Sequence, residues 1–147
     1  MSSSDAESMD FKIAKSAFDT KQFAVALPLL MPFAQQGHKI AQHLCAMMYQ
    51  YGLAGERNPQ QAFELMQASA AQGYGLAQHA LGFMYLEGNC TTQDSQQAAY
   101  WLQQASEQGL QGALVTLALM YKQGNGVAKN ENEAKRLYQL AGFSGSD

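Results

Sequence analysis

The stretch that decides the fold is AQHALGFMYLEGNCTTQDSQQAAYWLQQASEQG, residues 77–109. Its first part places apolar residues at i, i+4, i+7 and i+8, on one face of an α-helix: Ala77, Leu81, Met84 and Tyr85. Its second part has a similar helical spacing: Ala98, Trp101, Leu102 and Ala105. The segment between them is a turn with glycine and asparagine at its start. The stretch therefore predicts two helices joined by a turn.

The same pattern returns every 36 residues along the chain. The first-helix segments AQHLCAMMYQYG, AQHALGFMYLEG and ALVTLALMYKQG begin at Ala41, Ala77 and Ala113. The second-helix alanines keep the same spacing at Ala26, Ala62, Ala98 and Ala134. A helix pair in every unit predicts an all-α fold, a right-handed α/α solenoid of about three and a half helix-turn-helix repeats.

Start and stop signals support this division. Asn58 precedes Pro59, and Asp94 and Asn130 are each followed three residues later by a capping-box partner, Gln97 and Glu133. Gly37, Gly73 and Gly109 close the units. Glycine just past the helix end predicts left-handed stops at Gly73 and Gly109. Gly82 and Ala46 are small where two helices must approach closely.

We expect one solenoid over residues 10–143, with units at about 10–37, 38–73, 74–109 and 110–143. A flexible N-terminal segment is expected at 1–9 and a flexible tail at 144–147. The first unit is incomplete, with a short helix in FKIAKSAF, a turn at Asp19 and Thr20, and then its second helix. Pro28 and Pro32 each remove an amide donor, so we expect the helix over 23–36 to be bent or broken there.

The composition excludes several functions. The net charge is −3, and Arg57 is the only basic residue between Ile40 and Tyr121, so no basic stripe suits nucleic acid or an anionic membrane. Charged residues make up only 14%, and glutamine supplies much of the polar solvent surface instead. No apolar run predicts membrane insertion, and the N-terminus lacks a secretory pattern. Two cysteines make no disulfide framework, so we expect a cytoplasmic protein.

The unit at 77–109 resembles the Sel-one-like repeat, a tetratricopeptide-like helical repeat of roughly 36 residues. It carries that repeat's motif residues: Ala77, Leu81, Gly82, Tyr85, Gly88, Asp94, Ala98, Trp101, Ala105 and Gly109. Cys90, Thr91 and Ser106 depart from the motif. The resemblance covers about residues 10–143. It implies a protein-interaction adaptor or scaffold rather than an enzyme, and it names no partner.

The first helices of such a solenoid line a concave groove, where we expect a peptide or helix of another protein to bind. The predicted groove residues are Phe11, His43, Met47, Gln50, Tyr51, His79, Phe83, Leu86, Glu87, Val115, Leu119 and Lys122. The alternative is that they pack on the neighbouring repeat as core, and both interpretations stay open for Met47 and Leu119. Tyr51 and Leu86 are expected to be exposed near the mouth of the groove.

No catalytic residue, cofactor or metal site is predicted. His43 and His79 lie at equivalent positions in units roughly 10 Å apart, too far to share a zinc ion at about 2.0–2.1 Å. Hydrogen bonding to a partner is the role left to them. Cys45 stands at the buried leucine position of the motif, so we expect it to be an inert core residue.

Three alternatives remain at this point. The groove would equally serve an inhibitor, such as an immunity-type protein that blocks a specific toxin or enzyme. Some secreted relatives are associated with β-lactam binding or hydrolysis, but they carry a cysteine pair in each unit, which this sequence lacks. The helix from about Glu131 to Leu140 has no following unit, and exposure of Tyr138 and Phe143 would support a weak homodimer through this helix.

Overall fold

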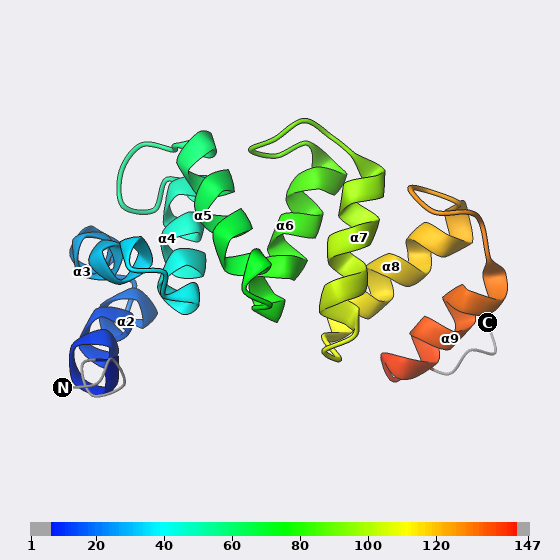
Figure 1. The fold of residues 1–147 in the computed structure, drawn as a ribbon, viewed down its shortest axis with the longest axis horizontal. Coiled ribbons are helices and arrows are strands. Elements are labelled where there is room, and N and C mark those ends of the chain that lie inside the picture. Colours follow the sequence, from blue (N-terminus) through cyan, green and yellow to red (C-terminus); the bar gives the residue numbers. More distant parts are fainter. Residues whose placement is uncertain (1–6, 144–147) are drawn as a thin grey trace. The chain divides into compact units, whose positions relative to one another are not determined.

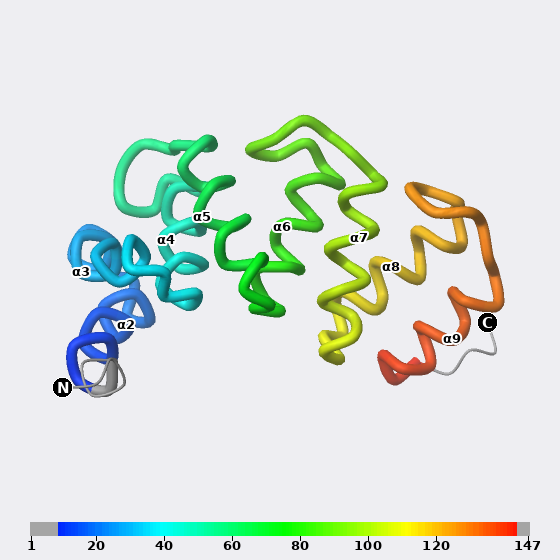
Figure 2. Tube along the Cα trace, viewed as in Figure 1, coloured from blue at the N-terminus to red at the C-terminus, as the bar shows by residue number. Residues whose placement is uncertain are grey.

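The computed structural model describes residues 7–143, with side chains described from residue 9. Within these residues the chain is all α, with one π-helical turn, eight α-helices and no strand (Figures 1 and 2). The elements are η1 (Glu7–Phe11), α2 (Lys12–Asp19), α3 (Phe23–Gln35), α4 (Lys39–Tyr51), α5 (Pro59–Ala71), α6 (Gly75–Glu87), α7 (Ser95–Ser106), α8 (Gln111–Gln123) and α9 (Glu131–Leu140). The predicted all-α repeat of helix pairs is confirmed.

The chain divides into two compact units, residues 1–72 and 73–147, which are described separately. In the first, each helix from α2 to α5 packs against the next, and the same holds from α6 to α9 in the second. A helical turn begins at Glu7, inside the segment expected to be flexible. The remainder of that segment, residues 1–6, and the tail at 144–147 lie outside the described residues. A continuous right-handed solenoid over 10–143 stays a prediction.

The second helices of the repeats are capped as predicted. The side-chain oxygens of Asn58, Asp94 and Asn130 accept hydrogen bonds from the backbone N–H three residues later, at 3.0–3.2 Å. Pro59 occupies the first turn of α5. These caps satisfy donors that every helix start leaves open.

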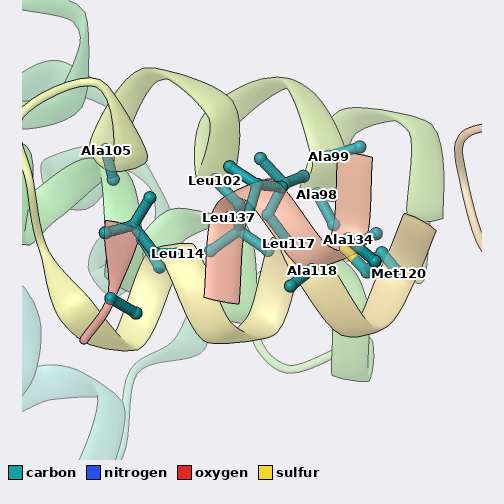
Figure 3. Packing of buried hydrophobic residues seen from close by; sticks show 12 residues of the cluster. Ala98, Ala99, Leu102, Ala105, Leu114, Leu117, Ala118, Met120, Ala134 and Leu137 are labelled. Atoms are coloured by element: carbon teal, nitrogen blue, oxygen red, sulfur yellow. The ribbon is translucent and has the colours of Figure 1, made fainter. Parts of the chain in front are cut away.

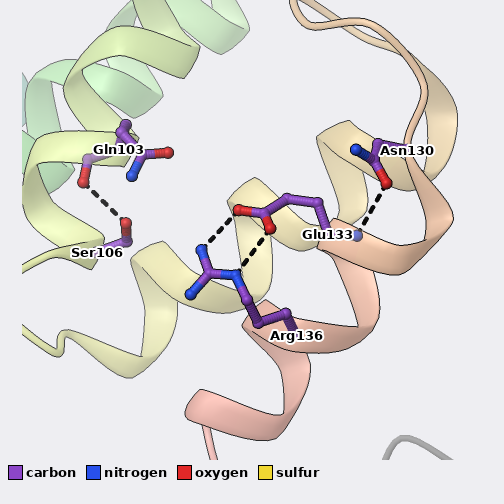
Figure 4. Close-up of polar contacts among 5 residues, drawn as sticks. All are labelled: Gln103, Ser106, Asn130, Glu133 and Arg136. Atoms are coloured by element: carbon purple, nitrogen blue, oxygen red, sulfur yellow. Dashed lines mark hydrogen bonds and ion pairs between the residues drawn. The ribbon is translucent and has the colours of Figure 1, made fainter.

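The capping box predicted at Asn130 and Glu133 is wrong in its second half, because the Glu133 side chain does not accept a hydrogen bond from the Asn130 N–H. The Glu133 carboxylate forms an ion pair with Arg136 at 2.6 Å (Figure 4). The Asn130 N–H is taken by the carbonyl of Tyr121 at 2.9 Å, nine residues back. Asn58 and Asp94 donate in the same way to Tyr49 and Tyr85. This backbone bond therefore ties each second helix to the end of its first helix.

Helix α3 runs unbroken through Pro28 and Pro32, so the expected break is wrong. A proline inside a helix removes one backbone hydrogen bond and costs about 3 kcal/mol. Both prolines lie on the exposed side of α3, as does Ala24, whose carbonyl loses its donor at Pro28. Water can hydrogen-bond to these carbonyls, which explains how the helix continues.

A core cluster of the second unit consists of alanine and leucine side chains and Met120 from α7, α8 and α9, with Ala141 just after α9 (Figure 3). Leu102, Leu117 and Leu137 are fully buried there. Gly82 of α6 packs against the same cluster, because a Cβ built on it would lie 2.7 Å from Cγ of Leu102. The predicted close approach at Gly82 is confirmed, as are the left-handed stops at Gly73 and Gly109, with φ of +86° and +80°.

Candidate functional site

The predicted groove residues of the first unit differ in exposure. Tyr51 is 59% exposed, as expected near a groove mouth, and His43 and Met47 are half-buried. Phe11 and Gln50 are buried, so neither is available on an open surface. The Phe11 ring stacks on His38 with centroids 4.2 Å apart and meets Phe33 edge-on at 5.6 Å. Phe11 is therefore a core residue that packs on Phe33 and His38.

The groove residues of the second unit form a surface with an apolar centre. Leu119 is 43% exposed, and Glu87 and Lys122 are also exposed. Three half-buried residues pack against the core cluster from its side: Phe83, Leu86 and Val115. Leu86 is therefore less open than expected. Both interpretations of this row apply, because its inner members support the core while its outer members face solvent.

Leu76 belongs to the same surface and was missed by the sequence analysis. It lies on α6, seven residues before Phe83 and therefore on the same helical face, and it is 46% exposed. Its spacing to Phe83 was the signal that could have found it. We call the set of Leu76, Phe83, Leu86, Val115 and Leu119 the α6/α8 face.

Helices α6 and α8 meet at His79 and Gly112. A Cβ on Gly112 would lie 2.9 Å from Cε1 of His79, so only a glycine lets the imidazole lie this close to α8. The His79 ring also meets Phe83 edge-on at 5.1 Å. Its Nε2 atom is buried without a hydrogen-bond partner among the described residues. His79 therefore acts as a packing side chain between the two helices.

Burial changes the titration of the histidines and of Cys45. It lowers the pKa of His43 from 6.5 to about 4 and also lowers the pKa of His79. Burial raises the pKa of the Cys45 thiol to about 12, so this fully buried side chain stays protonated and unreactive. The prediction of Cys45 as a core residue is confirmed. In residues 7–143, no group of three metal-ligating side chains is placed to hold an ion.

Glutamine has a structural role that the sequence analysis did not find. Nε2 of Gln72 donates to the Gly37 carbonyl at 2.9 Å and to Oε1 of Gln42 at 2.8 Å. Thirty-six residues later, Gln108 makes the same two bonds, to Gly73 and Gln78, both at 2.9 Å. Gln42 and Gln78 are buried, contrary to the expected solvent role. The shared 36-residue spacing of both glutamine pairs was the available signal.

The repeats match a known family model. The Sel1 repeat model matches residues 39–74, 75–110 and 113–142. No curated protein matches the chain significantly. None of the described helices has the length and apolar character that crossing a membrane requires.

Solved structures with the same fold come from several bacteria. A Sel1 repeat protein from Oxalobacter formigenes is 29% identical with a TM-score of 0.83, and the match covers 88% of this chain and 53% of that one. A protective antigen of uropathogenic Escherichia coli strains that displays an SLR fold is 33% identical with a TM-score of 0.76, covering 78% and 25%. Helicobacter pylori cysteine rich protein B, 19% identical with a TM-score of 0.64 and coverage of 80% and 87%, shares the fold. The chain thus spans about half the length of the Oxalobacter formigenes protein and a quarter of the Escherichia coli antigen.

Proposed function

Because the chain belongs to the Sel1 repeat family, we propose that it is an adaptor that binds a peptide or helix of another protein on the exposed surfaces of its first helices. Sel1 repeat proteins are generally protein-interaction scaffolds and typically not enzymes. The observation that carries the proposal is the α6/α8 face, where Leu76 and Leu119 are each more than 40% exposed. Apolar side chains this open gain free energy when a partner covers them.

The α6/α8 face has the composition of a helix-binding or peptide-binding surface. Its half-buried residues are held in place by the core of the unit, so they present a preformed floor. Glu87 and Lys122 stand exposed at the C-terminal ends of α6 and α8. Charges of opposite sign beside an apolar floor favour one orientation of the bound segment.

The test compares a double variant with a single control variant, and the replaced residues have similar exposed fractions. Leu76→Gln/Leu119→Gln makes the α6/α8 face polar without touching buried residues, and Tyr100→Gln alters an exposed aromatic residue of α7 in the same unit. A partner is first identified by pull-down from the native cell with the unaltered chain, and its affinity is then measured with purified proteins. We expect the double variant to weaken binding at least about tenfold, because two apolar side chains lose their burial.

Circular dichroism must show unchanged helix content in both variants. The proposal fails if the double variant binds as the original chain does, or if Tyr100→Gln weakens binding equally. Phe83→Ala is less informative, since Phe83 packs on the core and its loss is expected to lower stability as well.

A further inference from the structure

Helix α3 exposes apolar residues at two positions that are polar in all three later repeats. We call the following set the α3 face: Ala24, Val25, Pro28, Leu29 and Pro32, all exposed. The residues 36, 72 and 108 positions after Ala24 are Gln60, Gln96 and Asn132, and those after Val25 are Gln61, Gln97 and Glu133. These two positions are therefore polar in the three later repeats and apolar only in α3.

The first unit also leaves open a position that other units cover. Leu29 is 41% exposed, whereas its counterparts Leu65 and Leu137 are 8% and 1% exposed and Trp101 is half-buried. Only residues 20–22 connect α2 to α3, whereas segments 52–58, 88–94 and 124–130 connect the helices of the later pairs. The first unit therefore differs from the later repeats both in the length of this connection and in the exposure of Leu29.

The side chains of the α3 face form ridges against which another helix can pack. Val25 and Leu29 are four residues apart, and so are Pro28 and Pro32, which makes two parallel rows on one side of the helix. A helix packs its own row of side chains into the groove between such rows. Prolines in this position weaken α3 itself, and their exposed rings add apolar area that the core of the unit does not use.

Within residues 9–55 the charged side chains are four lysines and two aspartates, so this part of the chain has a net charge of +2. No aspartate or glutamate occurs between Asp19 and Glu56. Lys12, Lys21 and Lys39 are exposed on the elements that precede and follow α3. Lys15 is paired with Asp19 at 2.9 Å. A partner that carries carboxylates would meet attraction here, and a basic partner would be repelled.

We propose that the α3 face is a second docking surface, and that it binds an amphipathic helix whose apolar side is flanked by acidic residues. The apolar rows supply the contact area and the lysines select the acidic partner. This surface lies in the first unit and shares no residue with the α6/α8 face. It is therefore tested independently of the adaptor function proposed above.

Two synthetic helical peptides test the proposal directly. Both have leucine at every third or fourth position; one carries glutamate at the flanking positions and the other carries lysine. Fluorescence anisotropy is measured with each labelled peptide and the full chain. We expect the glutamate peptide to bind at least about tenfold more tightly than the lysine peptide, with a preference that weakens as salt is raised.

The variant Ala24→Gln/Val25→Gln copies the residues that stand at these positions in α5 and α7, so it should fold normally. We expect it to weaken binding of the glutamate peptide about tenfold, and Lys21→Glu to remove most of the preference between the peptides. Leu140→Gln and Lys135→Glu are the matched controls, since both residues are exposed on α9. Neither control should change the binding.

Equal binding of the two peptides, no effect of Ala24→Gln/Val25→Gln, or an equal effect of Leu140→Gln would each overturn the proposal. Evidence for a different occupant would overturn it as well. Binding to phosphatidylglycerol vesicles without binding to the peptide would assign the α3 face to a lipid surface. A dimer in light scattering that becomes a monomer in Ala24→Gln/Val25→Gln would assign it to a second copy of this chain.

Discussion

Gly82 and Leu102 determine how closely α6 and α7 pack, and replacing Gly82 tests that contact. In Gly82→Ala the new Cβ would lie 2.7 Å from Cγ and 3.0 Å from Cδ2 of Leu102. Ordinary carbon contacts are about 3.5–4.0 Å, so atoms must move by about 1 Å. Leu102 is fully buried and cannot turn toward solvent. Overpacking of this kind costs about 1–3 kcal/mol, whereas alanine gains about 1 kcal/mol over glycine in a helix.

The net expectation for Gly82→Ala is a loss of about 0–2 kcal/mol in the free energy of unfolding. The first unit suggests a rescue, because the counterparts of Gly82 and Leu102 there are Ala46 and Met66, both fully buried. Methionine is unbranched at Cγ and flexible, so it can yield to the alanine methyl group. Gly82→Ala/Leu102→Met should therefore be more stable than the sum of the two single changes, by about 1 kcal/mol.

Urea unfolding followed by circular dichroism measures all four proteins of this cycle. If Gly82→Ala is stabilised by the full gain in helix propensity, no clash exists at this contact. A coupling energy near zero between the two positions would equally refute the reasoning, because the rescue is expected only if the new methyl group contacts Leu102.

Three further predictions concern buried polar groups. The pKa of His43 is about 4 in the fold and 6.5 when unfolded, so the unfolded chain binds the proton first as the pH falls. The free energy of unfolding should therefore decrease by at most about 3 kcal/mol as the pH is lowered from 6.5 to 4. A pH series of urea unfolding checks this, and an equally steep profile for His43→Gln would contradict it. Gln108→Ala removes the bonds to Gly73 and to buried Gln78, so it should cost about 1–3 kcal/mol, while exposed Gln96→Ala should cost almost nothing in the same assay. In a Cys90→Ser background, Cys45 should react with a thiol reagent only as fast as the protein unfolds; rapid native labelling would show that its thiol is not protected.

The 36-residue period was sufficient to predict the helix pairs, their caps at Asn58, Asp94 and Asn130, and the close contact at Gly82. Each of these depends on local spacing or on one neighbouring helix, and both are visible in the sequence. The course of α3 was not predictable in this way. Proline rules state that Pro28 and Pro32 weaken a helix, but only the packed structure tells that the freed carbonyls face solvent.

The candidate site was predicted less well, because periodicity assigns a residue to a helical face without telling what covers that face. Phe11 and Gln50 fit the spacing of a groove row, yet they are buried. Leu29 and Leu137 occupy the same repeat position, yet one is exposed and the other is core. The connection before α3 is also shorter than those of the later helix pairs. Exposure therefore depends on contacts distant from the motif.

The repeats provide an internal reference that separates structural from functional residues. Phe83 is apolar and packs partly on the core cluster, which explains its character without any partner. Ala24 and Val25 break the pattern that their three counterparts keep, and core packing does not explain exposed apolar residues there. If both surfaces bind proteins, variants of one should leave binding at the other unchanged, since they lie in different units. Loss of both activities from a change in the α3 face alone would instead indicate a single partner that spans them.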